Sequence, residues 1–405
     1  MNYKQTLEYI HSLGKFTLPA SLDRIKAVMN KLNNPHNKFK SIHIAGTNGK
    51  GSVSAMLSSV FKEAGYKTGL FISPFIIDFK ERIQINGEFI SEKDLIEFSQ
   101  IIIDTHVKLN EFEFITAVAF LYFSEKKCDL VICETGLGGR LDATNVLENK
   151  IATVITKICL DHTAILGDSL KTIASEKCGI LRECPTVTTP YQPQEAYNVI
   201  KSKAKNLIVP CIDKLEIPDN YSDSNTYIYN GQEYKISLKG DFQIENSLMV
   251  IEAVRACGFD IAQHIVYKAL ANTYFPARME TVCEKPLVII DGAHNPDGAN
   301  VLAKELKKFN GKAVAIIGMM KDKDCKQVLK TTLPNCKEAV LVEVKGLSRS
   351  LSAEQLYTMA SEFCNCKIAT DYENALSKAR VIAGDSPIFV FGSLYLAADM
   401  RKLFF

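Results

Sequence analysis

Short apolar runs rich in β-branched residues alternate with helical patterns along most of the chain. The first run, Ser41–Ala45, precedes a glycine-rich loop, and apolar residues at helical spacing then extend from Val53 to Phe61 and end before Gly65. Similar runs lie at 67–73, 129–134 and 151–158. Near-continuous apolar strands separated by helices are typical of a parallel sheet that is covered on both faces. The pattern therefore predicts an α/β domain.

The pattern changes to an alternation of apolar and polar residues at Thr226–Leu238. Asn230-Gly231 lies between the two alternating halves and predicts a type I′ hairpin turn, so we expect an appended antiparallel piece. Helical patterns follow at about 242–257 and 261–272, and Phe275-Pro276 interrupts the chain.

A second series of strands and helices begins at Leu287. Its strands are expected near 287–292, 312–318, 338–344, 366–370 and 387–392. This series is long enough for an independent domain. We therefore predict two α/β domains, residues 1–280 and 281–405, with a boundary near 276–286 and a cleft between them.

Composition and charge exclude several classes of protein. Hydrophobic residues make up 47% of the 405 residues and charged residues 23%, as in a globular protein with a large core. The longest apolar stretch, Ile115–Phe123, has about nine residues, whereas a membrane-spanning helix needs about 20, so we expect no membrane span. The polar N-terminus lacks a secretory signal, which predicts a cytoplasmic protein. The net charge of +2 is spread along the chain and argues against nucleic acid or an anionic membrane as partner. The twelve cysteines form no Cys-x-x-Cys pair, so we expect reduced thiols.

The most specific motif is the glycine-rich loop Gly46–Ser52, which follows a strand and opens a helix. Backbone N–H groups of such a loop surround phosphate oxygens, the helix N-terminus adds partial positive charge, and Lys50 can reach the β- and γ-phosphates. Gly51 follows the lysine, so the hydroxyl of Ser52 comes one position later than in the common P-loop pattern. The loop predicts that the first domain is a large, P-loop NTPase-like domain that binds a nucleotide. The second series of strands and helices then predicts a smaller Rossmann-like α/β domain after it.

Glu134 ends an apolar run and is followed by three glycines within Glu134–Asn145. This placement puts its carboxylate at the C-terminal edge of a strand, where open α/β sheets bind ligands. A carboxylate beside phosphates is a suitable ligand for Mg²⁺, although a carboxylate at such a place can also be an ordinary ion-pair partner.

Other polar residues follow predicted strands or lie near the domain boundary. Asp161-His162 comes after a buried strand, and Lys177, at the end of a helical pattern from Ser169, is expected on the helix surface by its position alone. The segment Asp291–Pro296 follows another strand and can cap the next helix. Arg278 lies near the predicted boundary, from where its guanidinium could reach a γ-phosphate.

Taken together, these motifs resemble those of the folylpolyglutamate synthase/dihydrofolate synthase family, a branch of the Mur ligase superfamily. The resemblance covers nearly the whole chain, in the same order. The matching segments are Gly46–Ser52, Leu70–Pro74, Glu81–Gly87, Glu134–Asn145, Asp161–Ile180, Phe275–Glu280, Asp291–Asn295 and Gly392–Leu396.

The resemblance implies a set of site residues. Nucleotide contacts are implied for Asn48, Gly49, Lys50, Gly51, Ser52, Asn246, Arg278, Asp291 and His294. Mg²⁺ ligands are implied for Ser73, Glu134 and His162, so the metal takes its hydroxyl oxygen from Ser73 rather than from the loop. Lys177 matches a lysine that the family carboxylates with CO₂, and the catalytic set is Lys50, His162, Lys177 and Arg278. Phe75 stands where many relatives have His, and Ala277 where they have Gly.

The implied activity is an ATP-dependent amide ligation that joins L-glutamate to the carboxylate of a folate, of dihydropteroate, or of both, through an acyl phosphate. Its partners would be these small molecules, and a monomer is expected. Two alternatives remain at this point. One is another amide ligase of the Mur type, and the other is a P-loop switch that hydrolyses a nucleotide to change the state of a partner.

Overall fold

The computed structural model describes residues 1–14, 17–218 and 225–405. Its contacts divide the chain into two compact units. Unit 1 comprises residues 1–237 and 243–274, and unit 2 comprises Leu238–Phe242 together with Phe275–Phe405. Both units are α/β, in agreement with the predicted fold class.

Unit 1 contains an eight-stranded sheet in the order β4-β3-β2-β5-β1-β6-β7-β8. Its strands are β1 (Lys40–Ala45), β2 (Thr68–Phe71), β3 (Ile83–Ile85), β4 (Glu88–Phe89), β5 (Leu130–Glu134), β6 (Lys150–Ile155), β7 (Thr186–Thr188) and β8 (Leu207–Ile208). Within this order, the adjacent strands β2, β5, β1, β6, β7 and β8 pair in parallel. At one edge of the sheet, β3 pairs with β2 and β4 pairs with β3 in antiparallel orientation. The four predicted strands are therefore confirmed, and the four that were missed have only two or three residues each.

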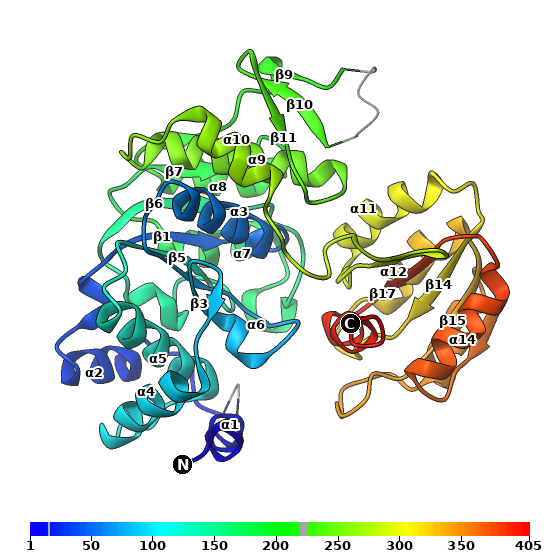
Figure 1. Ribbon diagram of the computed structural model, residues 1–405, viewed down its shortest axis with the longest axis horizontal. Helices are drawn as coiled ribbons and strands as arrows, with labels where there is room; N and C mark the ends of the chain where they lie inside the picture. Colours follow the sequence, from blue (N-terminus) through cyan, green and yellow to red (C-terminus); the bar gives the residue numbers. More distant parts are fainter. Residues whose placement is uncertain (15–16, 219–224) are drawn as a thin grey trace. The chain divides into compact units, whose positions relative to one another are not determined.

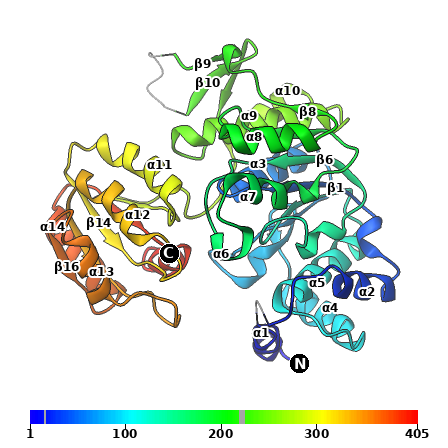
Figure 2. The same cartoon turned by 180° about the vertical axis from the view of Figure 1, so that it is seen from behind.

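Helices cover both faces of this sheet (Figures 1 and 2). They are α1 (Tyr3–Ser12), α2 (Asp23–Lys31), α3 (Lys50–Glu63), α4 (Glu92–Asp104), α5 (Glu111–Glu125), α6 (Thr163–Leu166), α7 (Leu170–Lys177), α8 (Gln194–Lys203), α9 (Asp241–Ala256) and α10 (Gln263–Ala271). One apolar core joins α1, α2, α4 and α5 to strands β2 and β5. A second joins α7 and α8 to the ends of β1 and β6. These cores fix β1 and β5 at the centre of the sheet.

The predicted hairpin is confirmed in a small sheet with the order β11-β10-β9. Its strands are β9 (Leu215–Glu216), β10 (Thr226–Tyr229) and β11 (Gln232–Lys235). Asn230 and Gly231 form a two-residue connection and both have positive φ, as a type I′ turn requires.

Unit 2 is a six-stranded sheet in the order β12-β13-β17-β14-β15-β16. Its strands are β12 (Glu280–Glu284), β13 (Leu287–Ile290), β14 (Ala313–Ile317), β15 (Cys336–Leu341), β16 (Cys366–Ile368) and β17 (Ile388–Phe391). Its helices are α11 (Pro296–Lys307), α12 (Cys325–Thr332), α13 (Ala353–Ala360), α14 (Tyr372–Ala383) and α15 (Leu394–Arg401). Five strands are parallel, as predicted, and β12 is an antiparallel edge strand that the pattern did not reveal.

Two further expectations bear on the class of protein. Across the described ranges, no helix is both long enough and apolar enough to cross a membrane. All twelve cysteines are free thiols.

Candidate active site

The glycine-rich loop joins β1 to α3, as its sequence predicts. Gly49 is the residue before α3 and has φ +91°, in the left-handed region that favours glycine. A Cβ atom at this position would lie 2.5 Å from Asn246 Oδ1, so a larger residue would collide with the side chain that α9 places against the loop. The loop is also tied to the segment after β6, because the backbone N–H of Thr47 donates to Lys157 O at 2.9 Å.

Lys50 and Glu134 meet at the ends of two neighbouring strands. β1 and β5 are paired in parallel, so the loop after β1 and the end of β5 lie at the same edge of the sheet. The Lys50 ammonium is 3.7 Å from Glu134 Oε1, and Glu134 is only 4% exposed. The backbone N–H of Ser73, which follows β2, donates to Glu134 Oε2 at 3.3 Å. Three residues predicted for the nucleotide and the metal are thus brought together.

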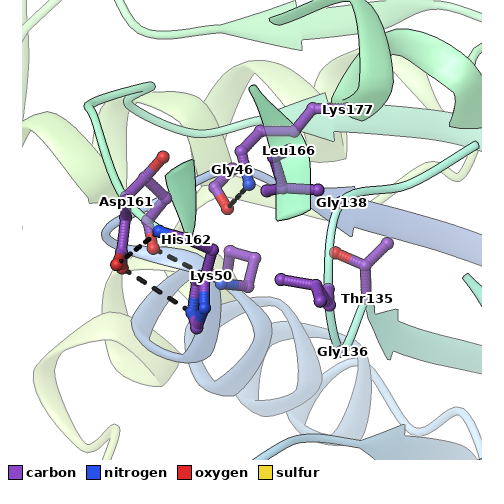
Figure 3. A pocket seen from close by; sticks show the side chains of 11 residues that line it. Gly46, Lys50, Thr135, Gly136, Gly138, Asp161, His162, Leu166 and Lys177 are labelled. Carbon is purple, nitrogen blue, oxygen red and sulfur yellow. Dashed lines mark hydrogen bonds and ion pairs between the residues drawn. The ribbon is translucent and has the colours of Figure 1, made fainter. Parts of the chain in front are cut away.

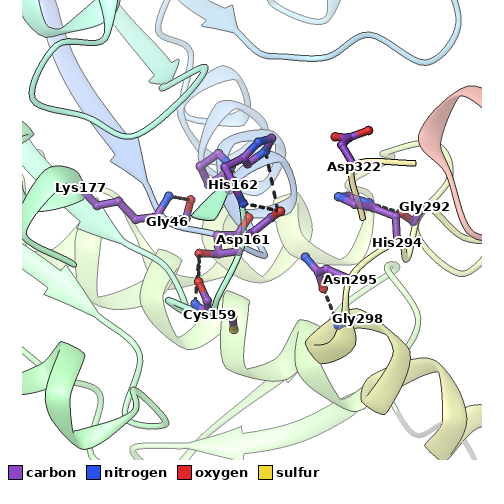
Figure 4. Close-up of polar contacts among 12 residues, drawn as sticks. Gly46, Cys159, Asp161, His162, Lys177, Gly292, His294, Asn295, Gly298 and Asp322 are labelled. Carbon is purple, nitrogen blue, oxygen red and sulfur yellow. Dashed lines mark hydrogen bonds and ion pairs between the residues drawn. The ribbon is translucent and has the colours of Figure 1, made fainter. Parts of the chain in front are cut away.

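A pocket opens beside this pair, and Figure 3 shows its lining. It is lined by Gly46, Thr47, Lys50, Thr135, Gly136, Leu137, Gly138, Asp161, His162, Leu166 and Lys177. His162 has φ +51° and directly precedes α6, and its backbone N–H donates to Asp161 Oδ1 at 2.8 Å (Figure 4). The pocket therefore combines the phosphate loop with His162 and Lys177, two residues far apart from it in sequence.

Lys177 is buried, and its expected place on the helix surface is wrong. It is 5% exposed, and its ammonium donates to the carbonyl of Gly46 at 2.6 Å (Figure 4). Burial, together with the smaller effect of the nearby charge of Lys50, lowers the pKa of Lys177 to about 7. The backbone makes this placement possible, because a Cβ on Gly139 would lie 2.7 Å from the carbonyl oxygen of Lys177. Pattern reasoning missed the burial because α7 ends against another loop rather than at solvent.

Ser52 and Asn246 belong to one buried network with Gln243. Gln243 Nε2 donates to Ser52 Oγ at 3.2 Å, and Asn246 Nδ2 donates to Gln243 Oε1 at 2.9 Å. Gln243 was missed by the sequence analysis. Its spacing of three residues from Asn246 in a helical pattern could have placed both on one face of the helix.

Arg278, Asp291 and His294 all lie in unit 2. The carboxylate of Asp291 accepts the backbone N–H groups of Met279 at 2.9 Å and Ala293 at 2.7 Å, and its burial raises its pKa despite the lowering effect of Arg278. His294 Nδ1 lies 2.8 Å from Gly292 O (Figure 4). Ala277 stands where the family resemblance implies Gly. This alanine has φ +53°, in the left-handed region where glycine is usual.

The chemistry of the donors can be compared with the predicted metal. Within residues 1–14, 17–218 and 225–405, no three His, Cys, Asp or Glu side chains are arranged to hold a metal ion. Mg²⁺ needs fewer protein ligands than that, because it takes one or two carboxylates and completes its shell with water and phosphate oxygens. The buried carboxylate of Glu134 beside Ser73 fits such an ion.

Two family models match successive parts of the chain. The Mur ligase middle domain matches residues 44–254, and the Mur ligase glutamate ligase domain matches residues 277–394. The fold and the site thus define an ATP-dependent, amide-bond-forming ligase of the Mur type.

Relatives that match this chain over its full length identify the family within this class of ligases. The chain is 36% identical to a dihydrofolate synthase/folylpolyglutamate synthase of Bacillus subtilis, with 99% of this chain and 98% of the relative covered. It is 32% identical to the folylpolyglutamate synthase of Lacticaseibacillus casei, at 99% and 98% coverage. The chain belongs to the folylpolyglutamate synthase/dihydrofolate synthase family.

Solved structures have the same fold. Escherichia coli FolC in complex with DHPP and ADP has a TM-score of 0.90 and 28% identity, with 100% of this chain and 97% of that chain covered. A Mycobacterium tuberculosis folylpolyglutamate synthase complexed with ADP and AMPPCP also has a TM-score of 0.90 and 28% identity, at 100% and 99% coverage.

Proposed function

We propose that this chain uses ATP to attach L-glutamate to the carboxylate of a pterin, and that it accepts both a folate and dihydropteroate. The observation that carries the proposal is the meeting of Lys50 and Glu134 at the phosphate loop, beside the pocket that also holds Lys177. A cation at the phosphates and a carboxylate for a divalent ion are what phosphoryl transfer from ATP requires.

The reaction needs activation because a carboxylate does not react with an amine at neutral pH. An oxygen of the pterin carboxylate attacks the γ-phosphorus of ATP, the bond to the bridging oxygen breaks, and ADP leaves. The amine of glutamate then attacks the carbonyl carbon of the acyl phosphate and loses a proton, and inorganic phosphate leaves with the carboxylate oxygen.

The residues of unit 1 supply binding and charge. Backbone N–H groups of Asn48–Ser52 surround the phosphates, and the ammonium of Lys50 neutralises charge on the transferring group. Asn246 contacts the nucleotide from α9. These roles are supported by the conformation of Gly49 and by the contact between Asn246 and the loop.

Glu134, Ser73 and His162 would hold Mg²⁺. When bound, the ion neutralises phosphate charge and orients the phosphate oxygens. Its place is supported by the buried carboxylate of Glu134 and its hydrogen bond from Ser73.

Lys177 is proposed to be carboxylated by CO₂. Only a neutral amine attacks CO₂, and a pKa of about 7 keeps a large fraction of Lys177 neutral at pH 7. The nitrogen lone pair forms a bond to the carbon of CO₂ and one N–H proton is released, which turns a cation into an anionic carbamate. That anion would lie near Lys50.

Arg278, Asp291 and His294 of unit 2 are assigned to the nucleotide, with Arg278 directed at the γ-phosphate and Asp291 at the ribose. The proposed domains are residues 1–280 and residues 281–405. The enzyme is proposed to act in the cytoplasm as a monomer, without a nucleic acid or membrane partner.

Purified protein with ATP, Mg²⁺ and labelled glutamate, offered dihydropteroate and a reduced folate separately, tests the proposal. Mass analysis should find one added glutamyl residue on each pterin and an equal amount of ADP. Addition to only one pterin would restrict the substrate class, and addition to neither would refute the function.

A further inference from the structure

A buried chain of hydrogen bonds leads from the centre of the large sheet to the pocket. His43 lies in β1 with no exposed surface, and its Nε2 atom is 2.8 Å from Thr144 Oγ1. Thr144 Oγ1 donates to Asp142 Oδ1 at 2.5 Å. Asp142 Oδ2 accepts the backbone N–H of Leu137 at 2.8 Å, and Leu137 lines the pocket. A fully buried histidine is thus connected to the pocket through two side chains.

The chemistry of the three groups fixes the direction of each hydrogen bond. Burial raises the pKa of Asp142, and the hydrogen bonds that it accepts from Leu137 and Thr144 oppose that shift. Because both carboxylate oxygens already accept backbone N–H groups, the single hydrogen of the Thr144 hydroxyl points to Asp142. The hydroxyl oxygen is left to accept, and His43 supplies the hydrogen from Nε2. Burial holds the pKa of His43 well below its usual value, so the ring is neutral and has one N–H. Within the described residues, His43 Nδ1 has no hydrogen-bond partner, so the bond to Thr144 is what orients the ring.

Asp142 organises the backbone that it touches. Besides the Leu137 N–H, its carboxylate accepts the backbone N–H of Thr144 at 3.0 Å, and it caps the 3-10 helix Ala143–Val146. Its two oxygens therefore hold both ends of the segment 137–144 together. We call Thr135–Gly138, which lines the pocket, the glycine loop. This loop follows β5 and is distinct from the phosphate loop Gly46–Ser52. Its shape depends on the orientation of the Asp142 carboxylate.

We propose that His43 and Thr144 are positioning residues that hold Asp142 and thereby shape the glycine loop for the acceptor substrate. The proposal rests on the ligase function above, in which the carboxylate to be phosphorylated lies next to the γ-phosphate. The phosphate loop is held by different contacts, including that of Thr47 with Lys157. Loss of the buried chain should therefore affect the pterin more than ATP.

Two pairs of variants test this inference in steady-state kinetics of the full chain. Thr144→Val removes the hydroxyl at nearly constant volume, and Thr144→Ser keeps it. His43→Leu removes the N–H donor, and His43→Gln keeps an N–H near the position of Nε2. Thr144→Val and His43→Leu should lower kcat/KM for the pterin about tenfold, the effect of one lost hydrogen bond, and change KM for ATP less than about twofold. Thr144→Ser and His43→Gln should restore most of the loss.

Thr153→Val is the matched control. Thr153 is fully buried in the same sheet, and its hydroxyl is 2.9 Å from Thr186 Oγ1, outside the pocket lining. It should lower the melting temperature to a similar extent and leave both KM values unchanged. The inference would be overturned if Thr144→Val kept the wild-type kcat/KM for the pterin, or if Thr153→Val lost as much of it as Thr144→Val. It would also be overturned if kcat/KM for the pterin were no higher in His43→Gln than in His43→Leu. Inactivity of the wild-type protein would instead refute the proposed function.

Discussion

At the scale of single residues, two lysines show what the sequence can reveal. Lys50 belongs to a glycine-rich loop after a strand, and this local context was enough to predict its place. Lys177 carries no such context, because its burial depends on the carbonyl of Gly46, which is 131 positions away in sequence. Patterns along the chain report local structure, and contacts of this range require the whole fold.

The lowered pKa of Lys177 predicts that the free energy of unfolding depends on pH. In CO₂-free buffer, the folded chain loses the proton of Lys177 near pH 7, whereas the unfolded chain keeps it up to about 10.5. Between these values the unfolded state binds more protons, so the free energy of unfolding, relative to Lys177→Met, should rise with pH. Denaturant unfolding at pH 7 and pH 9.5 measures this. Lys171→Met, an exposed residue of α7, should show no such trend, and a flat difference for Lys177 would contradict the assigned pKa.

The pair of Lys50 and Glu134 predicts a loss of activity without a loss of fold. Lys50→Met or Glu134→Gln removes charge stabilisation from the transferring phosphoryl group, so kcat should fall by about 100-fold or more. Far-UV circular dichroism should remain that of the wild type. Lys62→Met changes an exposed lysine on the same helix and should retain full turnover. Near-normal turnover in either site variant would remove the assignment.

At the scale of elements, all parallel strands of four or more residues in the described part of the chain were predicted, whereas β16 is the one shorter strand that was. β7 and β8 have too few residues for a period to emerge, and β12 runs antiparallel at an edge where its residues are half-buried. The hairpin was predictable because Asn230-Gly231 satisfies a strict backbone requirement. The same reasoning applies to the junction of β1 and α3. Gly49 is needed there because its φ is positive and because a Cβ atom would collide with Asn246.

Gly49→Ala should weaken nucleotide binding for both of these reasons. Gly65→Ala is a suitable control, because Gly65 has φ +88° and nothing within 4 Å of its missing Cβ. Both variants should lose about 1 kcal/mol of stability from the left-handed backbone. Only Gly49→Ala should also raise the Kd for ATP, by about tenfold or more, because its Cβ collides with Asn246. Calorimetric titration with ATP measures the difference, and equal Kd values would count against the role of the loop.

At the scale of the whole molecule, each unit has its own central sheet and core, and some of the residues predicted for the site belong to unit 1 and others to unit 2. The sequence indicated this division through the repeated strand–helix rhythm after Leu287.

A ligase and a nucleotide-dependent switch differ in what triggers the release of phosphate. The ligase should release ADP and phosphate at an appreciable rate only when a pterin and glutamate are both present, because the acyl phosphate must form on one and react with the other. Release in the absence of both would favour a switch. Lys50→Met provides the background rate in the same assay.

The most direct measurement follows the oxygen atoms of the acceptor. If the pterin carboxylate is labelled with ¹⁸O and the reaction is run with ATP, Mg²⁺ and glutamate, we predict that one labelled oxygen per turnover appears in the inorganic phosphate. Glutamyl product formed with unlabelled phosphate would contradict an acyl phosphate, and with it the account of this site.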